Sequence, residues 1–263
     1  MLTARGKLII RSSLKSFFNK LVRATLGLLW RLGLYKDSLS CKVTYRCLGM
    51  SRMDLATDAI VNVTDVRKLQ KKDHVFTEIA AQYGNPPNWS RDHGFVSLCR
   101  IILEQQISLS AANAHYLKLK SYLKGLTPQK ILRLSDEEMK QCQVSRQKAI
   151  YLRELALAVI EKRIIFKNLK HQDVARTREQ LTSIKGIGEW TTDIYLMFCL
   201  QSKDVFPIGD VAVIKTVKEL YFVETIDEIK ILAETWRPYK SLATYYFWHY
   251  YLSKRNRYQN AIA

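Results

Sequence analysis

The sequence predicts an all-α fold, a two-lobed helical bundle built around a central glycine turn. Three observations support this prediction. From Asp73 onward, apolar residues recur at a helical period almost without a break. No stretch alternates apolar and polar residues as a half-buried strand would, and no internal repeat is found. All five prolines fall at the edges of expected elements, where they can end or begin a helix.

The expected helices of the first half are bounded by caps and glycines. They run over residues 73–84, 95–103 and 108–125. Asp73 can cap the first of them, and Ser108 or Ser110 can cap the third. Gly84 and Gly125 end the first and third helices, because glycine readily adopts the backbone conformation that closes a helix.

Further helix-start signals follow along the chain. Thr127-Pro128 is a cap followed by a first-turn proline, while Ser135-x-x-Glu138 and Thr225-x-x-Glu228 are capping boxes. The remaining expected helices cover residues 145–162, 210–221, 225–234 and 242–252.

Length and charge limit the class of protein. At 263 residues the chain can bury a substantial core, as one domain with two lobes or as two small domains. Its formal net charge of +18 predicts a polyanionic partner. Charge alone does not separate a DNA enzyme from a ribosomal or membrane-surface protein. No run reaches the roughly 18 apolar residues of a membrane helix, so we expect no membrane association.

Residues 1–52 differ in composition from the rest. They hold eleven Lys or Arg and one acid, Asp37, with an amphipathic centre. This is typical of a targeting segment or a basic DNA-binding arm. The alternative is that the segment is upstream sequence and that the protein starts at Met50 or Met53. We therefore divide the chain into a basic extension, 1–52, and one helical domain, 53–263.

The cysteines are scattered along the chain, at positions 41, 47, 99, 142 and 199. They form no C-x-x-C pair and no cluster. This pattern indicates reduced thiols, and it predicts an intracellular protein without a metal or other cofactor.

The stretch from Leu181 to Val213 organises the chain. Gly186 and Gly188 stand one residue apart between two segments with helical periodicity. A Gly-x-Gly turn lets the chain reverse where a Cβ would clash, and it leaves amides unpaired at the start of the next helix. Such amides, with the helix dipole behind them, can bind a phosphate.

A carboxylate follows this turn at a fixed distance. Asp210 lies twenty residues past Trp190, after the Phe206-Pro207 corner and Gly209, at the start of another helical run. Hairpin, helix, corner and aspartate in this order resemble the helix-hairpin-helix DNA glycosylases. Segments around Trp89, GFVSLCRIILEQQISLSAA, QVSRQKAIYLRELA and WRPYKSLATYYFWHYY are similar to the 3-methyladenine DNA glycosylase II type. The resemblance covers about residues 73–252, with the hairpin motif at about 181–200.

The resemblance implies that Asp210 is the catalytic residue of a glycosylase that flips out and excises alkylated purines. A carboxylate stabilises the oxocarbenium-like charge that develops on the sugar, and it can orient the attacking water. An alkylated base already carries positive charge, so no general acid is required. An ordinary helix cap is the alternative interpretation of Asp210.

Three aromatic residues are candidates for the base pocket: Trp190, Trp248 and Tyr195. An indole face attracts a cationic alkylated ring. Trp190 and Trp248 match aromatic positions of the family, whereas Tyr195 is suggested by its helix alone. Each could instead be a core residue, since large aromatic side chains usually are.

We expect the hairpin and one turn to contact double-stranded DNA that carries a damaged base. The residues expected at this contact are Lys185, Gly186, Ile187, Gly188, Glu189, Thr191, Gln105 and Gln106. Gln106 is favoured as the wedge that fills the gap left by the flipped nucleotide. The alternative is that both glutamines lie at an exposed helix end.

Two departures from relatives sharpen the prediction. Trp190 stands where bifunctional members carry their Schiff-base lysine, so base release without strand cleavage is expected. The second departure is the N-terminal β domain of some relatives, for which residues 1–72 offer no strands. The scattered cysteines also exclude the four-cysteine iron–sulfur loop of some glycosylases. We expect a monomer at the DNA. The alternatives are a non-catalytic helix-hairpin-helix DNA-binding protein, and a glycosylase for another damaged or mismatched base.

Overall fold

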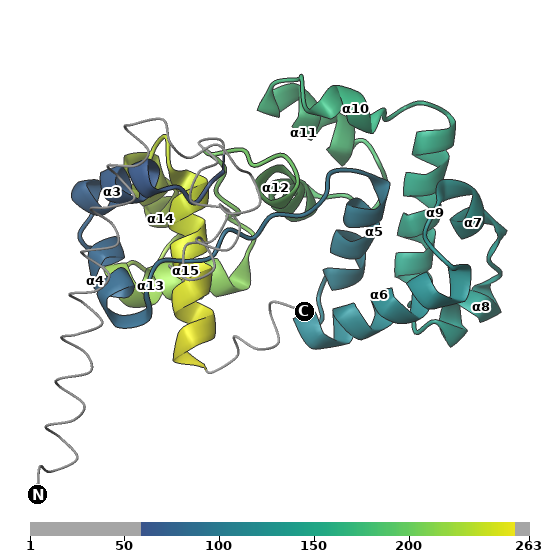
Figure 1. Cartoon of the computed structure of the whole chain (residues 1–263), viewed down its shortest axis with the longest axis horizontal. Helices are drawn as coiled ribbons and strands as arrows, with labels where there is room; N and C mark the ends of the chain where they lie inside the picture. Colours follow the sequence, from purple (N-terminus) through teal and green to yellow (C-terminus); the bar gives the residue numbers. More distant parts are fainter. Residues whose placement is uncertain (1–58, 256–263) are drawn as a thin grey trace, which may run out of the picture. The chain divides into compact units, whose positions relative to one another are not determined.

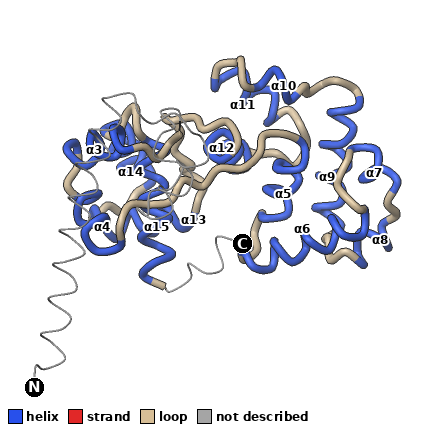
Figure 2. Tube along the Cα trace, viewed as in Figure 1, coloured by secondary structure: helices blue, strands red, loops and turns tan. Residues whose placement is uncertain are grey.

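A computed structural model describes residues 59–255 of the chain. Every regular element in this range is a helix, and Figure 2 shows no strand among the described residues, which confirms the all-α prediction. The predictions made for residues 1–52, and for Cys41 and Cys47, lie outside the described residues. The other three cysteines, Cys99, Cys142 and Cys199, are free and buried.

Most helices follow one another with short connections, and the two long connections are residues 84–94 and 199–210 (Figure 1). They are α3 (Val63–Lys72), α4 (Val75–Tyr83), α5 (Phe95–Glu104), α6 (Leu109–Leu123), α7 (Pro128–Arg133), α8 (Asp136–Gln141), α9 (Arg146–Ile160), α10 (Phe166–Leu169), α11 (Val174–Thr182), α12 (Glu189–Phe198), α13 (Val211–Tyr221), α14 (Ile226–Thr235) and α15 (Lys240–Lys254). No helix in residues 59–255 is long and apolar enough to cross a membrane.

The capping signals of the sequence are confirmed in most cases. Ser108, and not Ser110, caps α6, with its hydroxyl accepting from the amide of Ala111. Thr127 caps α7, with a proline in the first turn. Both capping boxes form, at Ser135 for α8 and at Thr225 for α14.

The prediction was incomplete at the start of the helical pattern. Helix α3 was not predicted, because its sequence VTDVRKLQKK is polar apart from a narrow apolar stripe. Asp73 ends α3, and the N-cap of α4 is His74. The Asp73 side chain still accepts from the amide of Val75 at 3.1 Å, so part of the expected capping contact exists.

The buried apolar residues fall into two clusters. One cluster is built by α3, α4, α13, α14 and α15, from the two ends of the described chain, and is called here the terminal lobe. The other is built by the helices from α5 to α11 and is called the central lobe. The chain therefore leaves the terminal lobe after α4 and returns to it after α12 (Figure 1).

Helix α12 belongs to both clusters. Ile194 and Tyr195 are buried in the central lobe, and Leu196 and Met197 are buried in the terminal lobe. An apolar helix of this kind shows no clear one-sided stripe, because neighbours cover it on more than one face. Trp248 of α15 packs against both clusters as well. Helix α12 and Trp248 therefore lie where the two lobes meet.

Candidate active site

The turn between α11 and α12 begins at Ser183 and ends at Gly188, the N-cap of α12. Gly186 has a φ of 91°, and a Cβ there would lie 2.1 Å from the ring of Tyr151 on α9. The expectation that this turn needs glycine is therefore confirmed at Gly186. It is wrong at Gly188, whose φ of −94° suits any residue and where a Cβ would meet nothing within 4 Å.

The start of α12 carries no side-chain cap. The amide of Ile187 bonds to the carbonyl of Ile184 at 3.0 Å, and the Ile187 side chain is buried. Ile187 therefore anchors the turn in the central lobe instead of offering a side chain to DNA. The amides at the first turn of an uncapped helix remain directed out along the helix axis, where an anion can meet them.

The other expected contact residues of the hairpin differ in exposure. Lys185 is exposed. Glu189 forms an ion pair with Arg178 of α11, and the same guanidinium bonds to Asp193 one turn further along α12, at 2.5 Å. Burial raises the pKa of Asp193 to about 6, and the hydrogen bond and charge of Arg178 oppose that rise. Arg178 thus ties α11 to the first turns of α12.

Asp210 is the N-cap of α13 and is 9% exposed. Its Oδ1 accepts from the amides of Ala212 and Val213, both at 3.0 Å. The indole Nε1 of Trp248 donates to the same oxygen at 3.2 Å, and the indole Nε1 of Trp190 donates to Oδ2 at 3.0 Å.

The sequence left two interpretations of Asp210 open, an ordinary helix cap and a catalytic carboxylate. It is a helix cap through one oxygen, as the alternative interpretation stated. Two indoles, from α12 and α15, also bond to it, which an ordinary cap does not require. Four donors fix the plane of the carboxylate, and among the described residues Trp190 is the donor to Oδ2.

Trp190 and Trp248 are brought together by this carboxylate, and both are partly buried. A further aromatic residue, Trp89, was not among the expected site residues. Its ring lies edge-on to Trp248, with centroids 6.3 Å apart, and its carbonyl accepts from the hydroxyl of Tyr245 at 2.6 Å. Its place in the family-like segment after Pro86-Pro87 was the signal that could have identified it.

Tyr195 lies elsewhere. It is fully buried, and its ring packs against His93 and Phe166 in the central lobe. Its hydroxyl bonds to His93 Nδ1 at 2.9 Å and accepts from the amide of Gly94 at 3.1 Å. Burial raises the pKa of this hydroxyl. The structure thus makes Tyr195 a core residue that secures the start of α5, and it does not join it to the Asp210 cluster.

The two expected glutamines also separate. Gln106 is exposed and has a φ of 59°, which few non-glycine residues adopt. Gln105 turns inward, and its amide nitrogen donates to the carbonyl of Gly186 and to Oγ1 of Thr191, both at 2.9 Å. Thr191 is itself buried, so its hydroxyl serves this internal bond, and its expected contact with DNA stays a prediction for its backbone amide.

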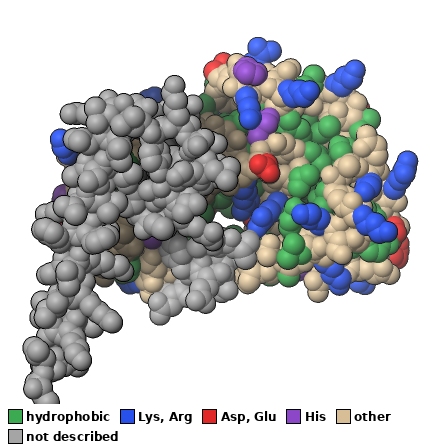
Figure 3. Space-filling view, viewed as in Figure 1, with side chains coloured by type: hydrophobic (Ala, Val, Ile, Leu, Met, Phe, Trp, Pro, Cys, Tyr) green, Lys and Arg blue, Asp and Glu red, His purple; other side chains and the backbone are tan. Residues whose placement is uncertain are grey.

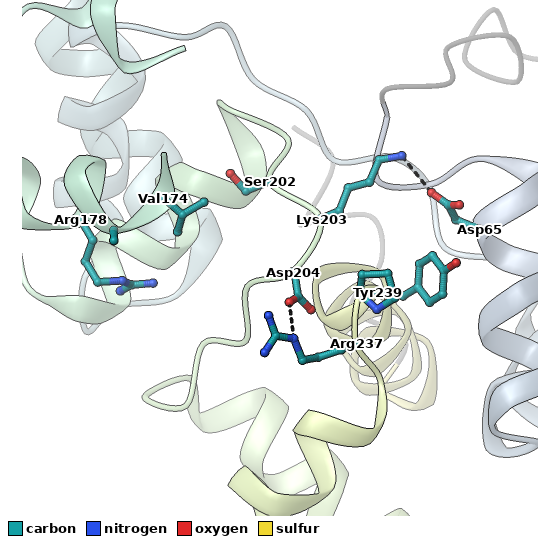
Figure 4. A pocket seen from close by; sticks show the side chains of 10 residues that line it. Asp65, Val174, Arg178, Ser202, Lys203, Asp204, Arg237 and Tyr239 are labelled. Atoms are coloured by element: carbon teal, nitrogen blue, oxygen red, sulfur yellow. Dashed lines mark hydrogen bonds and ion pairs between the residues drawn. The ribbon is translucent and has the colours of Figure 1, made fainter. Parts of the chain in front are cut away.

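A groove of about 790 Å³ lies beside α11 and the loop after α12 (Figure 4). Its charged residues are already paired: Lys203 bonds to Asp65 at 2.9 Å, and Arg237 bonds to Asp204 at 2.9 Å. Asp210 and its two indoles do not line it. The groove is therefore separate from the candidate active site. Among the described residues no group of three or more His, Cys, Asp or Glu could hold a metal ion.

The described residues form only helices, with a glycine turn before α12 and an aspartate at the start of α13 that two indoles bond to, as expected for a helix-hairpin-helix DNA repair enzyme. Residues 99–241 match the HhH-GPD superfamily base excision DNA repair protein, and the chain belongs to this family.

Individual relatives agree with this assignment. The chain is 28% identical over 181 residues to DNA-3-methyladenine glycosylase 1 of Schizosaccharomyces pombe, which covers 65% of this chain and 78% of that protein. Among solved structures, the DNA-3-methyladenine glycosidase of Bacillus halodurans is 30% identical with a TM-score of 0.62, over 74% of this chain and 92% of that one. The Schizosaccharomyces pombe 3-methyladenine DNA glycosylase bound to abasic DNA is 26% identical with a TM-score of 0.67, over 73% and 97%.

Proposed function

We propose that this protein is a monofunctional DNA glycosylase of base excision repair that flips out alkylated purines of the 3-methyladenine type and releases them by hydrolysis. The observation that carries the proposal is the Asp210 carboxylate, held by two indole N–H groups beside the family's hairpin. Family membership and the printed activities of the relatives support it.

The geometry of Asp210 suits the cleavage of an N-glycosidic bond. Positive charge develops on the sugar as the bond to the base breaks, and a fixed carboxylate stabilises that charge. Because Oδ1 already accepts three hydrogen bonds and Oδ2 accepts one from Trp190, Oδ2 has the greater capacity left for a water molecule. Oδ2 is therefore the oxygen that orients or deprotonates the attacking water.

Trp89, Trp190 and Trp248 form the walls that meet the flipped base. Their rings are large and electron-rich, and a base that carries a positive charge from alkylation is attracted to an indole face. The same charge makes the base a good leaving group, so selection and reactivity follow from one property of the substrate. Phe198, whose ring centroid lies 5.5 Å from that of Trp248, supports this wall from α12.

DNA is held by the α12 amides and by the positive charge of the protein. The turn at Gly186 directs the first amides of α12 toward a phosphate, and the exposed Lys185 adds a cation in the same turn. Lys and Arg side chains are spread over the visible face of the central lobe (Figure 3). Gln106 enters the duplex where the nucleotide leaves it. The protein acts on DNA as a monomer without a cofactor, inside the cell, in the nucleoid, the nucleus or an organelle.

Incubation with methylated DNA, followed by chromatography of the free bases, tests this proposal. The expected products are 3-methyladenine and related alkylated purines, released by the wild type and not by Asp210→Asn. Release of an oxidised or mismatched base instead would assign the protein to another lesion. Tight DNA binding with no base released by the wild type would make it a binding protein.

Borohydride added during turnover tests the monofunctional part. A lyase forms an imine between an amine and the sugar aldehyde, and reduction turns that imine into a stable protein–DNA adduct. We expect no adduct, because Trp190 stands where the amine would be. An efficient adduct that is lost in Lys185→Ala would contradict this expectation.

A further inference from the structure

The residues that lead from the end of α5 into the turn before α6 are held by hydrogen bonds from other parts of the chain. Nζ of Lys148, on α9, donates to the carbonyl of Leu103 at 2.6 Å. The next residue, Glu104, accepts two hydrogen bonds from the guanidinium of Arg91, both at 2.8 Å. Two successive residues at the end of α5 are thus fixed by cations from other parts of the chain.

The third of these residues, Gln105, is hydrogen-bonded to the hairpin. Nε2 of Gln105 donates to the carbonyl of Gly186 and to the hydroxyl of Thr191, both at 2.9 Å. One acceptor belongs to the hairpin turn and the other to the first turn of α12. Gly186 and Thr191 flank the α12 amides that bind the phosphate in the proposed function. Gln105 therefore connects the turn between α5 and α6 directly to these amides.

The chain changes character immediately after Gln105. Gln106 has a φ of 59°, and residues 106–110 are all exposed. Ile107 and Leu109 are 37% and 44% exposed, although both are apolar. Because residues 103–105 are fixed, the exposed residues 106–110 can keep their conformation when they contact another molecule.

We infer that Gln105 is a positioning residue that sets the distance between the Gln106 wedge and the α12 amides that bind the DNA phosphate. When these amides bind the phosphate, the wedge is placed at the base step that opens. The inference rests on the proposed function, in which Gln106 fills the gap left by the flipped nucleotide. It assigns Gln105 a role through its neighbours and not through a contact with DNA.

The physical reason is preorganisation. A wedge recovers part of the cost of extruding a nucleotide only if it reaches the stack at a fixed offset from the phosphate that the hairpin holds. Without the two Gln105 hydrogen bonds, residues 106–110 must become ordered while the nucleotide flips, and the cost of that ordering slows flipping. Binding to undamaged duplex does not need the wedge, so its affinity stays unchanged.

The test uses a duplex in which 2-aminopurine lies beside an alkylated base. The fluorescence of 2-aminopurine rises when base stacking is disrupted, so it reports opening of the duplex. Base release is measured in parallel under single-turnover conditions. Gln105→Met keeps the length of the side chain and removes its donors. Opening and release are expected to slow about tenfold, while the affinity for undamaged duplex stays within about twofold. Thr191→Val removes one of the two acceptors and is expected to slow both steps about threefold.

A double-mutant comparison separates a positioning role from a direct contact. In a Gln106→Ala background, Gln105→Met is expected to change the rate of opening by less than about twofold, because the wedge that it positions is gone. Full additivity of the two substitutions, or an equal loss of affinity for undamaged duplex in Gln105→Met, would overturn the inference. Thermal melting of each variant identifies any loss that comes from unfolding.

Failure of the inference differs from failure of the proposed function. If Gln106→Ala opens the duplex normally, the wedge assignment fails and the role of Gln105 fails with it. If Gln106→Ala is defective while Gln105→Met and Thr191→Val are normal, the wedge stands and the positioning role of Gln105 is wrong.

Discussion

Two aspartates in this protein have nearly the same local chemistry and lie in very different surroundings. Asp73 accepts from the amide of Val75 through Oδ1, and from the hydroxyl of Tyr221 at 2.6 Å and Nε1 of Trp236 at 3.0 Å through Oδ2. Asp210 likewise accepts from backbone amides at the start of a helix and from indole nitrogens.

The difference lies in where the donors are. Trp236 is fully buried in the core of the terminal lobe, and its ring packs on Phe76 with centroids 5.9 Å apart. The two indole donors of Asp210, from Trp190 and Trp248, are only partly buried, and Trp248 contacts both lobes. Asp73 therefore bonds to an indole of the core, while the two indoles that bond to Asp210 keep part of their surface exposed. The hydrogen bonds alone do not tell a structural carboxylate from a catalytic one.

The first way to break this comparison is to neutralise each carboxylate. Asp210→Asn is expected to lower single-turnover base release by about 10²–10⁴, because both the electrostatic and the general-base contribution are lost. Asp73→Asn is the matched control and is expected to leave that rate unchanged in the folded protein. A loss below tenfold at Asp210, or an equal loss at Asp73, would contradict the assignment.

The indole donors give the second test. Trp190→Phe keeps an aromatic ring and removes the N–H that bonds to Asp210, so base release is expected to fall about tenfold to a hundredfold. Trp236→Phe makes the same change at Asp73 and is expected to lower the melting temperature without changing the rate of base release. Comparing the rates of both variants at a temperature where each is folded decides the point.

Stability gives the third test, in the opposite direction. Asp73→Asn is expected to lower the free energy of unfolding by about 1–3 kcal/mol, since an amide cannot accept from all three donors and one buried group is left unpaired. Asp210→Asn is expected to cost less, because an amide oxygen in the place of Oδ1 still accepts from Ala212, Val213 and Trp248, and the donor that is lost, Trp190, is only partly buried. Urea unfolding of the two variants measures the difference, and a larger loss at Asp210 would show that its site is built for stability.

The two aspartates also show how far the sequence leads. The order of hairpin, corner and Asp210 identified the catalytic candidate, because this order is set locally along the chain and by family resemblance. Asp73 was expected only as a cap, since its partners Tyr221 and Trp236 lie about 150 residues away in the sequence.

The remaining differences between expected and observed positions have the same origin. Tyr195 was expected in the base pocket and lies in the core, because the helical pattern does not tell which neighbour covers a face of α12. Gln105 was expected at the DNA and instead bonds to Gly186, and Trp89 was missed. Each of these outcomes depends on a contact between segments far apart in the chain, and one sequence contains no record of such contacts.

The smallest expected effect concerns the ionisation of Tyr221 beside Asp73. Burial, together with the hydrogen bond and the negative charge of Asp73, raises the pKa of Tyr221 above its ordinary value. In the unfolded chain a tyrosine titrates near pH ~10. Above that pH the unfolded state releases the proton while the folded state keeps it, so the free energy of unfolding falls as pH rises, by up to about 1.4 kcal/mol per pH unit for this one group.

Tyr221→Phe removes this titration and isolates it. The variant is expected to be less stable than the wild type at pH 8, because the hydrogen bond to Asp73 is lost, but its stability should fall less steeply above pH 10. Burial also raises the pKa of Tyr195, so Tyr195→Phe should flatten the alkaline slope as well and serves as a comparison away from Asp73. Urea unfolding between pH 8 and pH 11 measures the slopes. If the Tyr221→Phe and wild-type curves run parallel, Tyr221 keeps an ordinary pKa in the folded protein, and the Asp73 site is less buried than its hydrogen bonds indicate.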